Sequence, residues 1–415
     1  MSNKVPQIRF NGYSDAWVQR NLAELATMNA RIGWQNLRTS EFLDEGDYIL
    51  ITGTDFKDGE IDYSNIHYVE KERFDQDKKI QVQDGSILIT KDGTLGKVAY
   101  VKNLPGPATL NAGVFNIRVI NSDETDSKYL FHYLKAPFLL KFADEQSTGG
   151  TIKHLNQNVL VKFPVPLPGL DEQKRIANLL ESMDNLIAAN QRKLDLLKEQ
   201  KKGYLKKMFP KNGAKVPELR FAGFADDWEE RKLSDMANVK TGFPFKNENF
   251  VDDGQYLVIT NGNIQNDSAF VDGKVGNRIT AVTDEIKEKY TLNYGDILVT
   301  MDGTVGRTAK VVEGNQILAQ RVGRLVSEST PEFIYQWLNT GKFFTEMTKV
   351  SHGGTIKHIS LSEIGDYVAY VPTSKDEREK IGSLFLNIDK TITLHQRKLD
   401  LLKEQKKGFL QKMFV

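Results

Sequence analysis

The sequence contains no cysteine and no long run of apolar residues. Without cysteine, disulfide bonds, thiolate metal sites and cysteine nucleophiles are all excluded. No stretch approaches the roughly 18 apolar residues of a membrane-spanning helix, and residues 1–6 lack the apolar core of a signal peptide. We therefore expect a cytoplasmic protein without membrane association.

Net charge of either sign is also nearly absent, because 56 Lys and Arg residues are balanced by 55 Asp and Glu residues. Nucleic-acid-binding proteins usually carry a basic surplus. Any DNA-binding surface must therefore be a local basic patch that acidic residues elsewhere balance. The length of 415 residues suits two or three domains.

The motifs of common catalytic and cofactor sites are missing as well. There is no GxGxxG or GxxxxGKS/T phosphate loop, no HExxH zinc motif and no GxSxG nucleophile elbow. No Asn-Pro pair occurs, which excludes the Asn-Pro-Pro-aromatic motif of amino-methyltransferases, and the six histidines are scattered. We predict that the chain is not an enzyme and binds no cofactor or metal of its own.

The sequence instead consists of two similar halves. Residues 5–26 return as 216–237, residues 84–101 as 294–311, residues 147–156 as 351–360, and residues 191–209 as 396–414. Matching segments of the two halves are separated by 204 to 211 residues. This distance is much longer than the roughly 20–50 residues of a solenoid repeat. This pattern indicates a duplicated domain pair.

Each half begins with a globular part of mixed pattern. Short β-branched runs predict strands at 48–51, 87–90 and 98–102, and again at 256–260, 297–300 and 308–312. Residues 127–143 and 330–350 are predicted to be helices that Pro137 and Gly341 interrupt. A proline-containing hinge, at 163–169 and at 371–374, ends each globular part, and a long amphipathic helix follows.

These features divide the chain into four predicted segments. A globular domain at 1–168 and a spacer helix at 169–212 are followed by a second globular domain at 213–372 and a second spacer helix at 373–415. The predicted fold class is α+β, with two globular α/β domains separated by two long helices that form an antiparallel coiled coil. The duplication predicts a molecule with pseudo-twofold symmetry. In a compact molecule of this kind the second helix runs back beside the first, so the two helices are expected to be antiparallel.

Apolar residues in both predicted helices recur at alternating spacings of four and three, the heptad pattern of a coiled coil. The alternative is a helix packed only on its own domain, but about 38 residues span roughly 57 Å, more than the width of a small domain. Polar residues interrupt both seams at matching places, Asn190 with His395 and Lys201 with Lys406, where they could fix the register. The predicted helix-pairing residues are Ile176, Leu180, Met183, Ile187, Leu194, Leu197, Ile381, Phe385, Ile388, Ile392, Leu399 and Leu402.

The order of globular part, proline hinge and helix, repeated twice, resembles the DNA-specificity subunits of type I restriction–modification systems. The segments that carry the resemblance are GGTIKH at 149–154 and 353–358, the hinge followed by DEQKRIANLLESMD at 171–184, and LLKEQKKGYLKKMF at 196–209 with its near copy at 401–414. The resemblance covers the whole chain, in order, twice.

This resemblance implies that each globular part is a target-recognition domain that reads one half of an asymmetric bipartite site in double-stranded DNA. It also implies that the helices set the half-site spacing and dock two modification (methyltransferase) subunits, with restriction (translocase and nuclease) subunits in the larger complex. S-adenosylmethionine, ATP and Mg²⁺ are then expected on those partners. The residues alone also permit a stand-alone DNA-binding regulator or a coiled-coil protein scaffold.

Loops after the predicted strands hold the candidate DNA contacts. Segments 91–97 and 301–307 combine a tight Asp-Gly turn with Thr and Lys or Arg, which suit phosphate contact, and the GGTIKH loops add backbone amides and a lysine. Segments 52–57 and 260–264 differ between the copies and contain side chains that can read base edges. The candidates are Thr52, Thr54, Lys57, Lys91, Thr94, Lys97, Thr148, Lys153, Asn261, Asn263, Thr304, Arg307 and Lys357.

Each of these loops also has an ordinary structural explanation. Segments 91–97 and 301–307 could be plain hairpin tips, the other loops could be solvated turns, and His154 and His358 could cap a neighbouring strand. Residues 30–46 and 241–254 also differ between the copies. Two different sets of contact loops predict two different half-sites.

Overall fold

The structure is a computed structural model, and it describes residues 5–92, 95–145, 155–211, 213–265, 268–327 and 329–414. The chain divides into two compact units, Met1–Ala189 with Leu399–Val415, and Asn190–Lys398. The boundary falls inside both long helices rather than at the ends of the predicted globular domains. Each unit therefore holds one globular head, residues 5–169 or 209–374, together with one part of each long helix.

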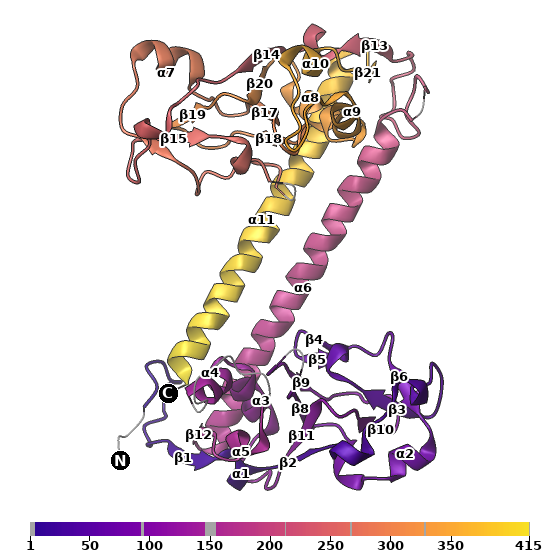
Figure 1. Cartoon of the computed structure of the whole chain (residues 1–415), viewed down its shortest axis with the longest axis vertical. Coiled ribbons are helices and arrows are strands. Elements are labelled where there is room, and N and C mark those ends of the chain that lie inside the picture. Colours follow the sequence, from indigo (N-terminus) through magenta and orange to yellow (C-terminus); the bar gives the residue numbers. More distant parts are fainter. Residues whose placement is uncertain are drawn as a thin grey trace. The chain divides into compact units, whose positions relative to one another are not determined.

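The first head contains two four-stranded sheets (Figure 1). In the sheet β2-β11-β8-β9 all neighbouring strands are antiparallel, whereas the sheet β6-β3-β10-β7 pairs β10 with β3 in parallel. The strands are β2 (Ala26–Ala30), β3 (Tyr48–Ile51), β6 (His67–Val69), β7 (Gln81–Val82), β8 (Ile87–Thr90), β9 (Val98–Tyr100), β10 (Ala108–Leu110) and β11 (Val114–Val119). A separate hairpin joins β4 (Phe56–Lys57) and β5 (Glu60–Ile61).

The second head has a similar topology, but its second sheet has three strands where that of the first head has four. Its antiparallel sheet has the order β14-β20-β17-β18, and its second sheet, β16-β15-β19, again contains one parallel pair, β15 with β19. The strands are β14 (Asn238–Thr241), β15 (Tyr256–Ile259), β16 (Arg278–Ile279), β17 (Ile297–Thr300), β18 (Thr308–Lys310), β19 (Gln316–Leu318) and β20 (Val322–Val326). The predicted strands are confirmed: β3, β8 and β17 coincide with the predicted ranges, and β9, β15 and β18 end one or two residues early.

A pair of helices packs against the antiparallel sheet of each head. They are α3 (Ser127–Lys135) and α4 (Phe138–Glu145) in the first head, and α8 (Pro331–Leu338) and α9 (Lys342–Val350) in the second. The two predicted helices are thus confirmed, with breaks at Pro137 and Gly341. Gly341 has a φ of +90°, a left-handed conformation that glycine adopts without a Cβ clash. Shorter helices are α1 (Leu22–Leu25), α2 (Lys71–Asp75), α5 (Gln157–Leu160), α7 (Asp284–Tyr290) and α10 (Leu361–Gly365).

The two predicted hinges are partly β-strand. In the first head β12 (Pro164–Leu167) pairs antiparallel with β1 (Val18–Asn21), and in the second head β21 (Val368–Val371) pairs with β13 (Glu229–Lys232). Proline lacks the amide that a central strand must donate, but it is tolerated in a two-stranded ribbon where one edge needs no partner. Each ribbon therefore joins the start of a head to the start of the following helix.

The long helices are α6 (Leu170–Met208) and α11 (Lys375–Met413), each of 39 residues. Both begin before the predicted apolar seam does. None of the predicted pairing residues is exposed. The buried ones are Ile176, Leu180, Met183, Leu194, Leu197, Ile381, Phe385 and Leu399, and the half-buried ones are Ile187, Ile388, Ile392 and Leu402. Near the end of α6 the half-buried Leu205, rather than the exposed Tyr204, packs against the core. No helix in the described ranges combines the length and apolar character that a membrane span requires.

Contacts within each unit establish that the helices are antiparallel. In the first unit the end of α11 enters the head, where Phe414 joins the core that contains Ile176, while Lys406 pairs with Asp184 further along α6. In the second unit Met208 joins the core that contains Ile381, and Lys201 pairs with Asp389. Along these contacts the residue numbers of α6 increase while those of α11 decrease, so the two helices run in opposite directions. The predicted fold class is confirmed.

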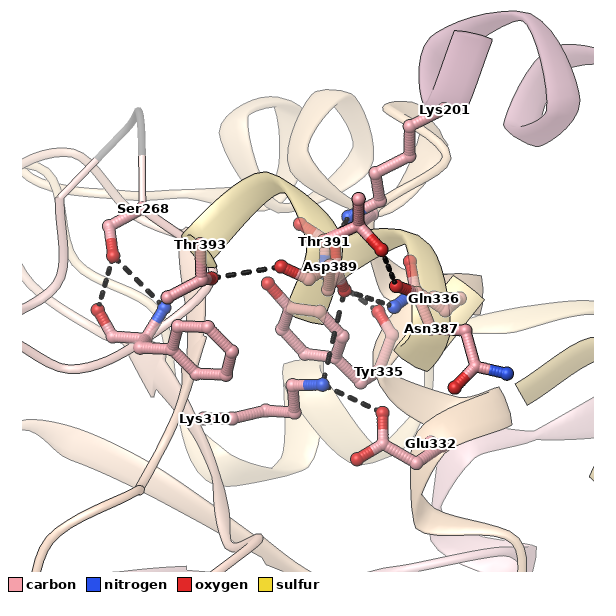
Figure 2. Close-up of polar contacts among 12 residues, drawn as sticks. Lys201, Ser268, Lys310, Glu332, Tyr335, Gln336, Asn387, Asp389, Thr391 and Thr393 are labelled. Carbon is pink, nitrogen blue, oxygen red and sulfur yellow. Dashed lines mark hydrogen bonds and ion pairs between the residues drawn. The ribbon is translucent and has the colours of Figure 1, made fainter. Parts of the chain in front are cut away.

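A polar group, the Asp389 cluster (Lys201, Lys310, Glu332, Gln336 and Asp389), joins the second head to both helices (Figure 2), and Lys310, Gln336 and Asp389 are its buried members. The Asp389 carboxylate of α11 lies 2.7 Å from Lys201 Nζ of α6 and accepts a hydrogen bond of 2.9 Å from Gln336 of α8. Lys310 of β18 lies 3.9 Å from the same carboxylate and 2.7 Å from Glu332. Asp389 and Lys310 are each 3% exposed, so each of these buried charges needs an opposite charge nearby to be stable.

The first unit contains the corresponding Asp184 cluster (Lys406, Asp184, Lys135 and His132). Lys406 of α11 pairs with Asp184 of α6, and the head contributes Lys135 at 3.6 Å and the buried His132 at 4.0 Å. Asp184 and Lys201 each stand 205 positions before Asp389 and Lys406. The polar seam lysines predicted to fix the register are thus the partners of two equivalent aspartates.

Replacing Asp389 with alanine should leave Lys201 and Lys310 in a buried site without their shared carboxylate. Removing one member of a buried ion pair costs about 3–5 kcal/mol, so Asp389→Ala should lower the free energy of unfolding by that amount in urea denaturation. Asp195→Ala is the matched control, because Asp195 is exposed on α6 and accepts a hydrogen bond from Gln191 (3.0 Å). Its effect should stay within about 0.5 kcal/mol. Equal effects of the two variants would contradict a stabilising role for the cluster.

The buried His132 should make folding sensitive to acid. Burial lowers the pKa of His132 to about 3, and Lys406, Lys135 and Lys128 lower it too, although Asp184 acts in the opposite direction. An unfolded histidine has a pKa near 6.5, so between these values only the unfolded chain binds the proton. The stabilisation present above about pH 6.5 is therefore lost progressively as the pH falls toward 3.

His132→Gln tests this, because Gln336 occupies the corresponding position of the second head. The substitution should reduce the slope of unfolding free energy against pH by up to about 1.4 kcal/mol per pH unit between about pH 6.5 and 4.5. Urea denaturation across this range measures the slope for both chains. Identical slopes would rule out a proton uptake by His132 on unfolding.

Candidate nucleic-acid interface

Several loops of the second head meet at one edge of its sheets. The parallel strands β15 and β19 end together, where Ala319 N donates to Ile259 O at 2.9 Å. In the antiparallel sheet β17 ends at Thr300 opposite Val322, the first residue of β20, and β14 ends at Thr241 opposite Gly323. We call the segments that follow β14, β15 and β17, with the turn before β20, the loop edge of the second head.

The first head has the same arrangement. Its strand β3 ends at Ile51 opposite Leu110, β8 ends at Thr90 opposite Val114, and β2 ends at Ala30 opposite Phe115. The segments 30–46, 52–55 and 91–97 all start from this loop edge. The sequence-predicted contact segments, which lie far apart along the chain, are therefore brought together by strand order.

The GGTIKH segment of the second head joins this edge. Gly303 N donates to Lys357 O at 2.8 Å, Ile359 N donates to Met301 O at 2.9 Å, and the His358 ring is hydrogen-bonded to the Asp302 carboxylate. In the first head the equivalent bond runs from Leu155 N to Lys91 O at 3.0 Å. In the second head the two motifs, which were predicted separately, thus form one surface, and His358 binds the loop that follows β17. The GGTIKH segment of the first head, 149–154, lies outside the described residues.

Four candidates of the first head lie at its loop edge. Thr52 caps a short turn, because its hydroxyl donates to Asp55 at 2.9 Å and accepts from Thr54 N at 3.3 Å. Burial is the main reason that the pKa of Asp55 is raised. Thr54 and Lys97 are exposed, and the half-buried Lys91 has its ammonium 5.7 Å from the centre of the Phe115 ring.

Lys57 lies apart from the other candidates of the first head. It belongs to the β4–β5 hairpin, whose turn packs on α3 through a hydrogen bond of 2.9 Å from Lys135 to Asp58 O. Its ammonium is 3.2 Å from Asp62, and hydrogen bonds from Ser64 and then Lys57 lower the pKa of Asp62 to about 2. Three other predicted candidates, Thr94, Thr148 and Lys153, lie outside the described residues, as does His154.

The second-head candidates differ in how accessible they are. Asn263 is 1% exposed, accepts from Thr260 N at 2.9 Å and donates to Asp272 O and Val275 O, so it braces its loop rather than facing solvent. The half-buried Asn261 accepts from Met301 N at 3.3 Å and so links two loops of the edge. The exposed candidates are Thr304 and Lys357, and Arg307 is half-buried.

One residue that the sequence did not single out occupies this edge. Arg321 lies in the turn before β20, its side chain is 61% exposed, and its Nη1 donates to Asp302 at 2.7 Å. Burial alone would raise the pKa of Asp302, but the hydrogen bonds from His358 and Arg321 outweigh it and lower that pKa. A comparison of the two halves could have identified Arg321 from the sequence. The position before Val322 holds this arginine, whereas the equivalent position before Val114 holds Gly113.

No group of three or more His, Asp or Glu side chains in the described part of the chain is arranged to hold a metal ion. What both loop edges offer is polar side chains, exposed cations and backbone amides. These are the groups that contact phosphates and base edges in protein–DNA interfaces.

Comparison with known proteins identifies the family to which the chain belongs. A model described as the type I restriction modification DNA specificity domain matches residues 14–199 and, a second time, residues 225–404. The chain belongs to this family. The two matches fall on the two halves of the internal repeat, so each head with its following helix is one specificity domain.

Curated specificity subunits extend this likeness over nearly the full chain. The type I restriction enzyme MjaVIII specificity subunit of Methanocaldococcus jannaschii is 23% identical over 421 residues, which cover 94% of each protein. The type I restriction enzyme EcoBI specificity subunit of Escherichia coli is 24% identical over 340 residues, or 73% of this chain and 67% of that protein. This chain is accordingly a DNA-specificity subunit, the non-catalytic component of a type I system.

Solved structures share the fold of this specificity subunit. The crystal structure of the type I restriction-modification system S subunit from M. genitalium aligns with a TM-score of 0.68 at 15% identity, covering 99% of both chains. A chain from a structure that describes complex assembly and conformational transition of the type I system aligns with a TM-score of 0.50 at 15% identity. The duplicated α+β architecture with two long helices is therefore that of a specificity subunit.

Proposed function

We propose that each head reads one half of an asymmetric bipartite site in double-stranded DNA through its loop edge. The observation that carries this proposal is the convergence at one edge of segments that differ between the heads, next to motifs that the heads share. The shared segments 91–97 and 301–307 suit phosphate contact, which positions a protein on the duplex. The differing segments after β2 and β3, and after β14 and β15, suit base readout.

The candidate contacts enter this proposal in two groups. Lys91, Lys97, Thr304, Arg307 and Lys357 are proposed to contact phosphates, as are Thr94, Thr148 and Lys153. Thr52, Thr54 and Asn261 are proposed base or groove contacts. Asn263 supports Asn261 from inside the loop, and Lys57 contributes only if the DNA reaches the β4–β5 hairpin.

The helices α6 and α11 are proposed to set the distance between the two half-sites. Each helix begins beside one head, and an Asp–Lys pair joins the two helices in each unit. Geometry of this kind makes half-site spacing a property of the protein.

The helices are also proposed to dock two modification subunits, with restriction subunits in the larger complex. Exposed leucines stand at equivalent positions of the repeat, Leu196 on α6 and Leu401 on α11, 53% and 59% exposed. Equivalent surfaces suit two copies of one partner. We propose that S-adenosylmethionine, ATP and Mg²⁺ bind to those partners, and that the complex works in the cytoplasm.

Deleting the gene for this chain in a host that carries its partner subunits should remove one bipartite methylation pattern from the genome. The pattern should consist of two different half-sites, because the loop edges differ. Long-read methylation sequencing with and without the gene measures this. A stand-alone regulator or a scaffold would leave methylation unchanged, and a perfectly palindromic site would contradict two different readers.

Lengthening both helices should lengthen the DNA spacer. Four residues inserted after Ala189 and four before Leu401, which lies opposite Ala189 in the register of the Asp184–Lys406 and Lys201–Asp389 pairs, add about 6 Å along each helix. Because DNA rises about 3.4 Å per base pair, the spacer should grow by one or two base pairs while both half-sites keep their sequences. Inserting the residues in α6 alone is the control, since it breaks the matching register and should reduce activity. An active doubly lengthened chain with the original spacer would refute the role of the helices.

A further inference from the structure

The turn between β19 and β20 holds an arginine in an unusual backbone conformation. Arg321 has a φ of +71°, in the left-handed region that non-glycine residues rarely adopt. Strained residues of this kind persist where the surrounding structure holds them, and they are often found at functional sites. Here the strain places a long cationic side chain at the loop edge, where it is 61% exposed.

A chain of polar contacts holds the guanidinium in place. Asp302, whose side chain is 16% exposed, accepts from Arg321 Nη1 at 2.7 Å through one carboxylate oxygen, and its other oxygen is hydrogen-bonded to His358. His358 is in turn anchored by paired backbone hydrogen bonds with His352, at 2.8 and 3.0 Å. The guanidinium has five N–H donors, and the bond to Asp302 engages one of its nitrogens. Its remaining donors stay available to a partner in a defined orientation.

The first head carries a glycine at the position equivalent to Arg321. Its antiparallel sheet brings Gly113 to the same place, directly before Val114, which pairs with Thr90 as Val322 pairs with Thr300. Glycine offers no guanidinium at this position. The heads therefore differ at this position in side-chain chemistry and also in backbone conformation, because Arg321 has a positive φ and Gly113 does not.

We propose that Arg321 reads a guanine in the half-site of the second head, and that Asp302, braced by His358, is its positioning residue. Arginine pairs with the O6 and N7 atoms of guanine through two parallel hydrogen bonds, which distinguishes guanine from the other bases in the major groove. An arginine already oriented by a carboxylate loses less conformational freedom when it binds. This inference rests on the proposed function, because it assigns one base contact within the proposed half-site.

The decisive variant is Arg321→Gly, which copies Gly113 of the first head and relieves the left-handed strain. Removing the guanidinium while keeping the turn should relax one guanine position in one half-site, with a loss of discrimination on the order of ten- to a hundredfold. The half-site of the first head and the spacer should not change. Methylation sequencing of a host carrying the partner subunits reads all three features at once.

Two further variants separate base reading from charge alone. Arg321→Lys keeps the charge but not the planar fork, so it should relax the same guanine position. Asp302→Asn should weaken discrimination at that position alone, since it acts through Arg321. Arg231→Ala is the matched control, because Arg231 is also exposed and bonded to a carboxylate, that of Glu229 at 2.8 Å, but lies on β13. Its methylation pattern should equal that of the unchanged chain.

Each outcome has a distinct meaning. Full methylation by Arg321→Lys with uniform weakening by Arg321→Gly would indicate a phosphate contact and overturn the inference. A half-site motif that keeps its sequence and strength in Arg321→Gly would overturn it as well. In both cases the unchanged chain still directs bipartite methylation, so the proposed function stands. Absence of any methylation that depends on the unchanged chain would instead refute the proposed function.

Discussion

The pairing of an aspartate on one long helix with a lysine on the other is the interaction on which the architecture depends. In the second unit Asp389 of α11 holds Lys201 of α6, and in the first unit Asp184 of α6 holds Lys406 of α11. Asp389 is buried and the other three charges are half-buried, so a slipped register would leave charges in the helix seam without their partners. An apolar seam alone would tolerate such slippage far better.

The same aspartates also bind the heads. Gln336 and Lys310 approach Asp389 from the second head, and His132 and Lys135 approach Asp184 from the first. One carboxylate therefore fixes three elements at once, two helices and a head. This explains why each compact unit contains parts of both helices and why the contacts do not follow the boundaries of the repeat.

Duplication gives the two heads one framework with different surfaces. The antiparallel sheets, the parallel strand pairs and the helices beside them correspond between the heads. Side chains at the loop edges depart from this correspondence, as Arg321 and Gly113 illustrate. The proposed reading of two different half-sites fits this combination, because rigid strands position the loops while loop residues differ between the heads.

The sequence by itself determined the duplication, the family, the strands β3, β8 and β17, and the apolar seams, because these depend on local pattern and on direct similarity between the halves. It also marked Lys201 and Lys406 as interruptions of the seams. Only the tertiary structure decided which groups satisfy those lysines, since Asp389 and Asp184 lie far away along the chain. It likewise decided that Asn263 is buried, that Lys57 lies apart from the loop edge and that Arg321 lies at it. Strand pairing and burial are set by contacts between distant segments, and no local pattern in one sequence encodes them.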